Sequence, residues 1–246
     1  MKIAIDPGHG IDTPGKRTPA FEDGSVMLEN EFNEGVAYYL HEALLRNELT
    51  PYNVAEEQTD IPLRIRTDRA NNAKVDLYVS IHANAYGTTW NKAHGLETYV
   101  YSMADTETVN IAQKVQEALV RATGLTDRGV KAKDLHVLRE SKMPAILVEC
   151  GFMTNRVEAE LLKKDSYRKL CAEAICEGIC YAFGYNYKNS DTEKVKIIVD
   201  GVEHRVTGIK VEEPSGATNY VKIRDIAPLL GYEVSSKGSV PVLTKK

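Results

Sequence analysis

The residues Asp76–Ile81, Asp-Leu-Tyr-Val-Ser-Ile, form the clearest strand signal in the sequence. The segment is rich in apolar residues and is bounded by polar ones, a pattern typical of a strand that is buried inside a sheet. Short apolar runs also occur far away along the chain, at Lys2–Ile5 and at Ala145–Glu149, which follows Pro144. We therefore predict strands at all three places.

Amphipathic segments separate these apolar runs. Glu31–Asn47 carries apolar residues on one helical face, as a helix that packs on a core would. Further helices are predicted at Leu63–Ala73, Thr106–Thr123, Asn155–Lys164 and Tyr167–Phe183, and further strands at Tyr52–Ala55, Leu96–Tyr101 and Leu135–Leu138. Strands that alternate with helices predict an α/β fold with a mostly parallel central sheet flanked by helices.

The composition changes after Gly184. Residues 186–193 are polar and are typical of a linker between a main domain, 1–185, and a small C-terminal α+β domain, 194–246. In the second domain, Asp200-Gly201 separates two short apolar runs and predicts a hairpin. Tyr220–Leu230 predicts a strand that leads into a short helix.

The charge balance limits the kinds of partner. The 246 residues include 31 Lys and Arg against 35 Asp and Glu, for a net charge of −4. Nucleic-acid binding depends on neutralising phosphates, so we expect no nucleic-acid partner. No run reaches the roughly 18 apolar residues of a membrane span, so we expect no membrane insertion. The first residues lack the pattern of a signal peptide, which predicts synthesis in the cytoplasm and release by another factor if the target lies outside.

Polar residues follow three of the predicted strands. His9 follows the first strand, His82 follows Asp76–Ile81, and Glu149 ends Ala145–Val148. Sites in parallel sheets form beyond the carboxyl ends of the strands, so these side chains are expected at one edge. Two histidines and a carboxylate are ligands that a catalytic zinc ion accepts, with a fourth position left for water.

The third metal ligand is open on spacing alone. Glu29 is our preferred candidate because it shares a helical face with Phe32 near the start of the first helix. The other carboxylates in reach are Glu22, Asp23 and Glu31.

Two further polar residues are candidates for substrate binding. Asn84 could hydrogen-bond a peptide or orient His82. His94, which precedes a predicted strand, could touch substrate or metal.

Several motifs in order carry a family resemblance over roughly residues 1–184. Asp6–Gly10 and Ser80–Ala85 resemble the two histidine motifs of the zinc-dependent N-acetylmuramoyl-L-alanine amidases of the amidase-3 family. The other matching segments are Glu29–Asn33, Arg66 with Ala70–Asn71, Gly95–Tyr99, Arg128–Lys131, Val137–Arg139, Met143–Ala145 and Leu147–Asn155.

The resemblance implies both a metal site and a reaction. Zinc would be held by His9, Glu29 and His82, and Glu149 would be the catalytic general base and then acid for zinc-activated water. The implied reaction hydrolyses the amide between the lactyl group of N-acetylmuramic acid and L-alanine in peptidoglycan, the expected partner. A zinc endopeptidase that cuts within the stem peptide, or a non-catalytic wall-binding protein, is the alternative.

The C-terminal segment resembles a different module. Val199–Val202 followed by Asn219–Val234 is similar to the copper amine oxidase N-terminal-like domain, with Lys222 in place of that pattern's proline. We expect this domain to bind the cell wall or to form a homodimer. Without an export signal, the whole chain fits a phage or prophage endolysin released with the help of a holin, with a bacterial autolysin as the second context.

Overall fold

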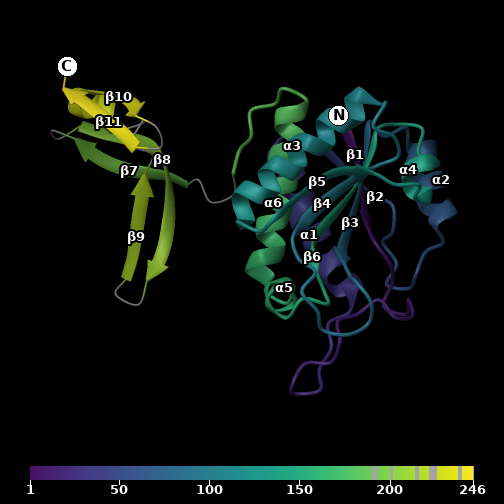
Figure 1. Cartoon of the computed structure of the whole chain (residues 1–246). Helices are drawn as coiled ribbons and strands as arrows, with labels where there is room; N and C mark the ends of the chain where they lie inside the picture. Colours follow the sequence, from purple (N-terminus) through teal and green to yellow (C-terminus); the bar gives the residue numbers. More distant parts are fainter. Residues whose placement is uncertain (190–192, 200–201, 214–215, 222–225, 238–239, 246) are drawn as a thin grey trace. The chain divides into compact units, whose positions relative to one another are not determined.

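We describe the protein from a computed structural model (Figure 1). The structure describes residues 1–189, 193–199, 202–213, 216–221, 226–237 and 240–245. The chain divides into two compact units, Met1–Tyr187 and Lys188–Lys246, and each is described by itself. Within the described residues, no helix combines the length and the apolar character needed to cross a membrane.

The first unit is built on a six-stranded sheet with the order β2-β1-β3-β6-β4-β5. Its strands are β1 (Lys2–Pro7), β2 (Thr50–Asn53), β3 (Leu77–Asn84), β4 (Leu96–Val100), β5 (Asp127–Ala132) and β6 (Ala145–Phe152). All neighbouring pairs are parallel except β4 and β6, which are antiparallel. The sheet is therefore mixed and mostly parallel, which confirms the predicted class.

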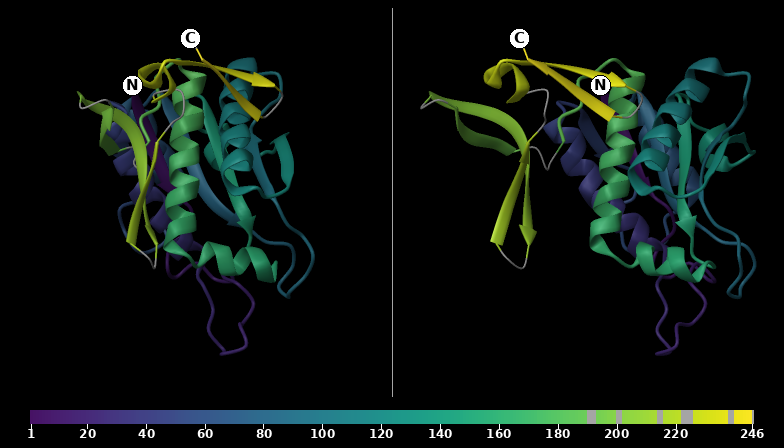
Figure 2. Two further views of the ribbon diagram at one scale, coloured as in Figure 1. Left: turned by 90° about the vertical axis from the view of Figure 1, so that its left-hand side faces the viewer. Right: turned by 60° about the vertical axis from the view of Figure 1, so that its left-hand side comes forward.

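Helices cover both faces of this sheet. The helices of the unit are α1 (Glu29–Arg46), α2 (Leu63–Ala73), α3 (Thr106–Thr123), α4 (His136–Arg139), α5 (Arg156–Leu162) and α6 (Asp165–Ala182). On one face α6 lies between α1 and α3 and contacts both (Figure 2). The other face is covered by α2 and α4, which contact each other.

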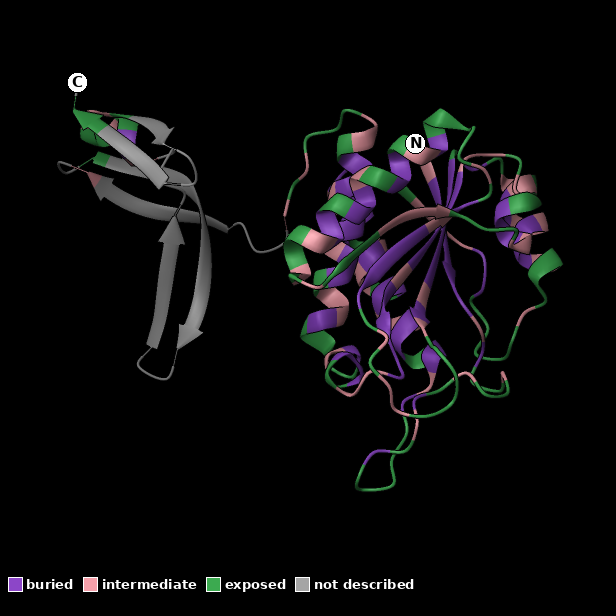
Figure 3. Ribbon diagram, in the orientation of Figure 1, coloured by how far each residue is buried: buried purple, intermediate pink, exposed green. Residues whose placement is uncertain are grey.

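The alternation of side chains along β1 shows why its sequence is apolar throughout. Ile3 and Ile5 are fully buried in the core under α1, α3 and α6, whereas Ala4 is buried in the smaller core under α2 and α4. Successive residues of a strand point to opposite faces, so a strand covered on both faces needs apolar residues at every position. Figure 3 shows the resulting buried layer along the strands.

One predicted strand is wrong. Leu135–Leu138 was expected to be a strand, but His136–Arg139 forms the short helix α4, and the strand in this region is β5. A short apolar run does not by itself distinguish a strand from a buried helical turn. The β5 sequence is mostly polar and contains Gly129 with a φ of 78°, so it lacks an apolar strand pattern.

Two helices of the first unit, α3 and α5, begin at a residue whose side chain caps the helix. Thr106–Thr123 is helical as predicted; Asp105 caps its start by accepting a hydrogen bond from the Thr108 N–H, and Gly124 follows its end with a φ of 70°. The Asn155 side chain accepts from the N–H groups at the start of α5, as expected of an N-cap residue.

The described part of the second unit consists of two antiparallel sheets and a short 3₁₀ helix, η1 (Ala227–Leu230). The strands are β7 (Glu193–Val199), β8 (Val202–Glu213), β9 (Gly216–Val221), β10 (Tyr232–Lys237) and β11 (Val240–Lys245). Val199 pairs with Val202, in agreement with the predicted hairpin, although its turn residues 200–201 lie outside the described residues. The predicted linker, 186–193, ends inside β7 because Glu193 already belongs to that strand.

Candidate metal centre

Three side chains of metal-ligating type meet near the carboxyl ends of β1 and β3. His9 lies in the turn after β1 with a backbone φ of 64°, which few residues other than glycine adopt. Glu29 is the first residue of α1, and it follows the long loop that leaves this edge of the sheet (Figure 1). His82 lies inside β3 rather than after it, because the strand continues to Asn84.

The Glu29 carboxylate lies between the two imidazoles. Its Oε1 is 2.9 Å from His82 Nδ1 and its Oε2 is 3.4 Å from His9 Nε2. One ligand atom from each of the three side chains lies within 4.8 Å of the others, the one such group found among the described residues. Ligand atoms held tetrahedrally at about 2.0–2.1 Å from zinc are separated from one another by distances within this limit.

The electrostatics of His9 and Glu29 suit a cation, whereas the Glu29 carboxylate raises the pKa of His82 as long as it is the partner of that imidazole. Burial lowers the pKa of His9 to about 4, so its imidazole is neutral at physiological pH. Burial opposes ionisation of Glu29, but its bond to His82 and the nearby cationic groups outweigh burial and lower the pKa of this carboxyl. The buried His9 Nε2 atom has no hydrogen-bond partner. A neutral imidazole nitrogen without a partner, beside an ionised carboxylate, fits a zinc ion.

Glu149 lies beside this cluster. The register of β3 and β6 places it opposite His82, and it lines the same cavity of about 710 Å³. Its Oε2 atom is buried without a hydrogen-bond partner, and burial raises the pKa of the carboxyl to about 7. A carboxyl with a pKa near neutrality can both accept and donate a proton at physiological pH.

The cavity also contains cationic residues that sequence reasoning missed. Lys16 lines the cavity with its Nζ 3.7 Å from Glu29 Oε2, and Lys133 lines it as well. Both lysines belong to irregular segments, where no periodic pattern marks a residue as facing a site. Lys16 places a positive charge beside the Glu29 carboxylate.

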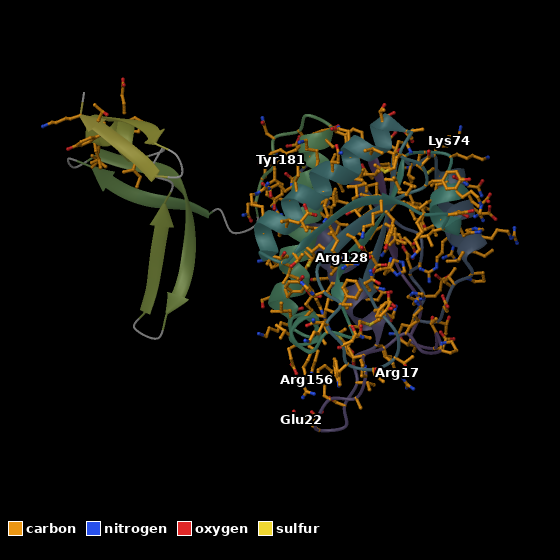
Figure 4. The ribbon with its side chains drawn as sticks, viewed as in Figure 1. Arg17, Glu22, Lys74, Arg128, Arg156 and Tyr181 are labelled. Atoms are coloured by element: carbon orange, nitrogen blue, oxygen red, sulfur yellow. The ribbon has the colours of Figure 1, made fainter. Side chains whose placement is uncertain are left out.

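The alternative carboxylates lie elsewhere. Glu22 pairs with Arg156 at 2.8 Å. Figure 4 labels both residues at the end of the unit where the long loop lies. Glu31 pairs with Arg168 on the outer side of α1, and Asp23 is exposed and bonded within its own turn. Of the four carboxylates that spacing left open, the structure brings Glu29 to the two histidines.

The two substrate-binding candidates differ in their surroundings. Asn84 lines the cavity and donates from Nδ2 to Glu97 Oε1 at 2.6 Å. Glu97 also accepts hydrogen bonds from Tyr99 and Arg128, so Asn84 belongs to a fixed polar network. His94 is exposed, contacts the carbonyl oxygen of Lys92 through Nδ1, and is not among the residues that line the cavity.

Gly8 is a further site residue, and its role depends on close packing. A Cβ atom at Gly8 would lie 2.2–2.7 Å from three atoms of the His82 ring.

Gly8→Ala is therefore expected to displace this imidazole and to weaken metal binding at least about tenfold, as loss of ligand orientation typically does. Metal affinity measured by competition with a chelator checks this. Gly87→Ala is the control, because a Cβ there meets nothing within 4 Å and Gly87 does not line the cavity; its φ of 68° strains the variant, so it reports a general loss of stability without a clash at His82. Equal affinities of Gly8→Ala and the parent would contradict the expectation.

The fold and the site define an α/β protein that carries, at the carboxyl ends of its strands, three side chains of metal-ligating type and a buried carboxyl with a raised pKa. The model of the Amidase_3 family, described as N-acetylmuramoyl-L-alanine amidase, matches residues 3–181. The chain belongs to this family, as its motifs predict.

The relatives of this chain include N-acetylmuramoyl-L-alanine amidases and an endolysin. N-acetylmuramoyl-L-alanine amidase LytC of Bacillus subtilis is 35% identical over 179 residues, 72% of this chain and 34% of LytC. The endolysin of Bacillus phage SPP1 is 39% identical over 198 residues, 79% of this chain and 70% of the endolysin. The crystal structure of an N-acetylmuramoyl-L-alanine amidase from Clostridium difficile 630 has a TM-score of 0.68 and 34% identity, covering 74% of this chain and 96% of that one. The chain thus spans about a third of the length of LytC and most of the solved amidase.

Proposed function

We propose that this protein is a zinc-dependent amidase that hydrolyses the bond between the lactyl group of N-acetylmuramic acid and L-alanine in peptidoglycan. The observation that carries the proposal is the meeting of His9, Glu29 and His82 beside Glu149 in one cavity of an Amidase_3 chain. Three protein ligands leave the fourth position of a tetrahedral metal open, as catalytic zinc sites require.

Glu149 supplies the proton transfers in this proposal. Zinc, when bound, provides a Lewis acid that activates water and polarises the amide carbonyl at neutral pH. The Glu149 carboxylate accepts the proton of the attacking water, and its protonated form donates that proton to the departing alanine nitrogen. The raised pKa of Glu149, about 7, suits a group that must act in both directions.

The distinguishing experiment is digestion of purified cell walls with the zinc-loaded protein, followed by mass spectrometry and labelling of new amino termini. Free L-alanine amino ends, with intact muramic acid on the glycan, are the expected result. New amino ends inside the stem peptide would support the alternative, a zinc endopeptidase, because the same metal site could serve either bond. Binding to walls without any release would support the wall-binding alternative and overturn the proposed activity.

The metal ligands are tested separately from turnover. His82→Ala is expected to reduce bound zinc from about one ion per chain to nearly none, since two ligands seldom hold zinc against buffer. Elemental analysis of gel-filtered protein measures this. His94→Ala is the matched control, because His94 is exposed and lies outside the cavity lining, and this variant is expected to keep its zinc. Full zinc content in His82→Ala would remove His82 from the ligand set.

We further propose that the protein acts in cell-wall lysis as a phage or prophage endolysin, which its relationship to the SPP1 endolysin supports. Residues 194–246 would add wall binding or dimerisation. Sedimentation equilibrium of the full chain distinguishes a homodimer from a monomer, and a wall-pelleting assay measures binding. A monomeric protein that stays in the supernatant when the walls are pelleted would contradict both roles for this segment.

A further inference from the structure

A buried carboxylate, Asp6, lines the same cavity as the three metal-type side chains. Asp6, near the end of β1, is 1% exposed, and each of its oxygens accepts a hydrogen bond from a different residue. Oδ2 accepts from Ser80 Oγ at 2.7 Å, and Oδ1 accepts from Arg66 Nη1 at 2.7 Å. The parallel register of β1 and β3 pairs Asp6 with Ser80, so the first of these bonds follows from strand pairing.

The Ser80 bond determines which nitrogen of His82 can face a metal. Ser80 and His82 lie on the same side of β3, two residues apart, with Ser80 Oγ 3.2 Å from His82 Nε2. A hydroxyl has one proton, and Ser80 donates it to Asp6. Towards His82 it can therefore only accept, so Nε2 must carry the proton. The other nitrogen, Nδ1, is the atom that faces Glu29.

The Arg66 bond leads to the other histidine. Arg66 is 1% exposed and lies in α2, and its Nη2 donates to the main-chain oxygen of His9 at 3.2 Å. Its Nη1 donates to the Pro7 oxygen at 2.6 Å as well as to Asp6. These bonds hold the main chain on both sides of Gly8 and support the unusual positive φ of His9.

We propose that Asp6 is a shared positioning residue for both histidine ligands, acting through the Ser80 hydroxyl on His82 and through the Arg66 guanidinium on His9. The inference rests on the metal site proposed above. Hydrogen bonds of this kind fix the tautomer and orientation of metal-binding histidines, and their loss typically weakens metal binding 10–100-fold. Asp6 would thereby couple the two ligands, of which one lies in the turn after β1 and the other in β3.

The affinity test uses Ser80→Ala in the full chain. This change removes only the hydroxyl, and it is expected to raise the zinc dissociation constant about 10–100-fold in competition with a chelator. Thr98→Val is the matched control, because it removes a fully buried hydroxyl that bonds Gln116 and touches none of the proposed ligands. The control is expected to bind zinc like the parent.

A spectroscopic readout separates positioning from general loss of structure. In the zinc-loaded protein with ¹⁵N-labelled histidine, the His82 Nε2–H should appear as a protected ¹H–¹⁵N signal, while Nδ1 carries no proton. In Ser80→Ala this signal should disappear, or its proton should exchange faster with water. In Thr98→Val it should be unchanged. Asp6→Asn supplies a second variant. The amide NH2 group of asparagine only donates, so it cannot replace the carboxylate oxygen that accepts from Ser80 or from Arg66.

The outcomes distinguish this inference from the proposed function. A proton on Nδ1 of His82 in the loaded parent would overturn it, and so would parental zinc affinity in both Ser80→Ala and Asp6→Asn. A parent that binds no zinc at all would instead contradict the proposed function. Weakened binding in both variants, with Thr98→Val unaffected, is the result expected if Asp6 positions the ligands.

Discussion

Glu149→Gln is expected to lower kcat for wall digestion by about 10²–10⁴-fold while zinc binding is retained. Glutamine has nearly the same shape as glutamate, but it can neither accept the proton of the attacking water nor return it to the leaving nitrogen. Glu149 is not part of the three-residue cluster, so the ligands remain in place. Initial rates of new amino-terminus release, together with elemental analysis for zinc, measure both quantities.

The control for this variant is Glu158→Gln. Glu158 is also buried, but it accepts hydrogen bonds from the N–H groups of Gly95 and Phe152 and is not among the residues that line the cavity. The control is expected to lose some stability while its kcat stays near that of the parent. A kcat within about threefold of the parent for Glu149→Gln would exclude Glu149 as the general base, because such groups contribute far more.

Arg66→Met is expected to lower the free energy of unfolding by about 3–5 kcal/mol, the typical cost of breaking a buried ion pair by removing one partner. The substitution leaves Asp6 buried without its cation, although the methionine side chain replaces much of the lost volume. It also removes the donors that satisfy the main-chain oxygens of Pro7 and Ile61. Urea unfolding followed by circular dichroism measures the change in midpoint.

Arg64→Met provides a matched control on the same helix. The Arg64 side chain is 75% exposed and pairs with Asp68 four residues later, an arrangement that contributes little to stability. The control should therefore unfold at nearly the parental urea concentration. Similar midpoints for Arg66→Met and Arg64→Met would contradict a stabilising role for the buried network.

Local patterns in the sequence were enough to predict much of the fold. The predicted helices Leu63–Ala73 and Thr106–Thr123 have the observed bounds. The second is capped by Asp105 and followed by Gly124, signals that act over one or two turns. The predicted strand at Leu135–Leu138 is a helix, because four apolar-rich residues carry too little periodicity to choose between the two structures.

The candidate site was only partly predictable. The rule that sites form at the carboxyl ends of parallel strands singled out His9, His82 and Glu149 from their positions along the chain. The same rule could not choose Glu29 from four nearby carboxylates, because packing against distant segments decides which residue of the loop and of the start of α1 faces the histidines. The motif resemblance, rather than spacing, pointed to Glu29.

By itself, the sequence determined the alternation of strands and helices, the bounds of helices such as Thr106–Thr123, and the family motifs, because each depends on neighbouring residues. The tertiary structure alone decided which distant residues share a hydrogen bond or a close contact. The register of β1 and β3 pairs Asp6 with Ser80, and close packing sets Gly8 against the His82 ring. Strand pairing is a long-range choice, made by burying a whole sheet between two helical layers, and no local pattern contains it.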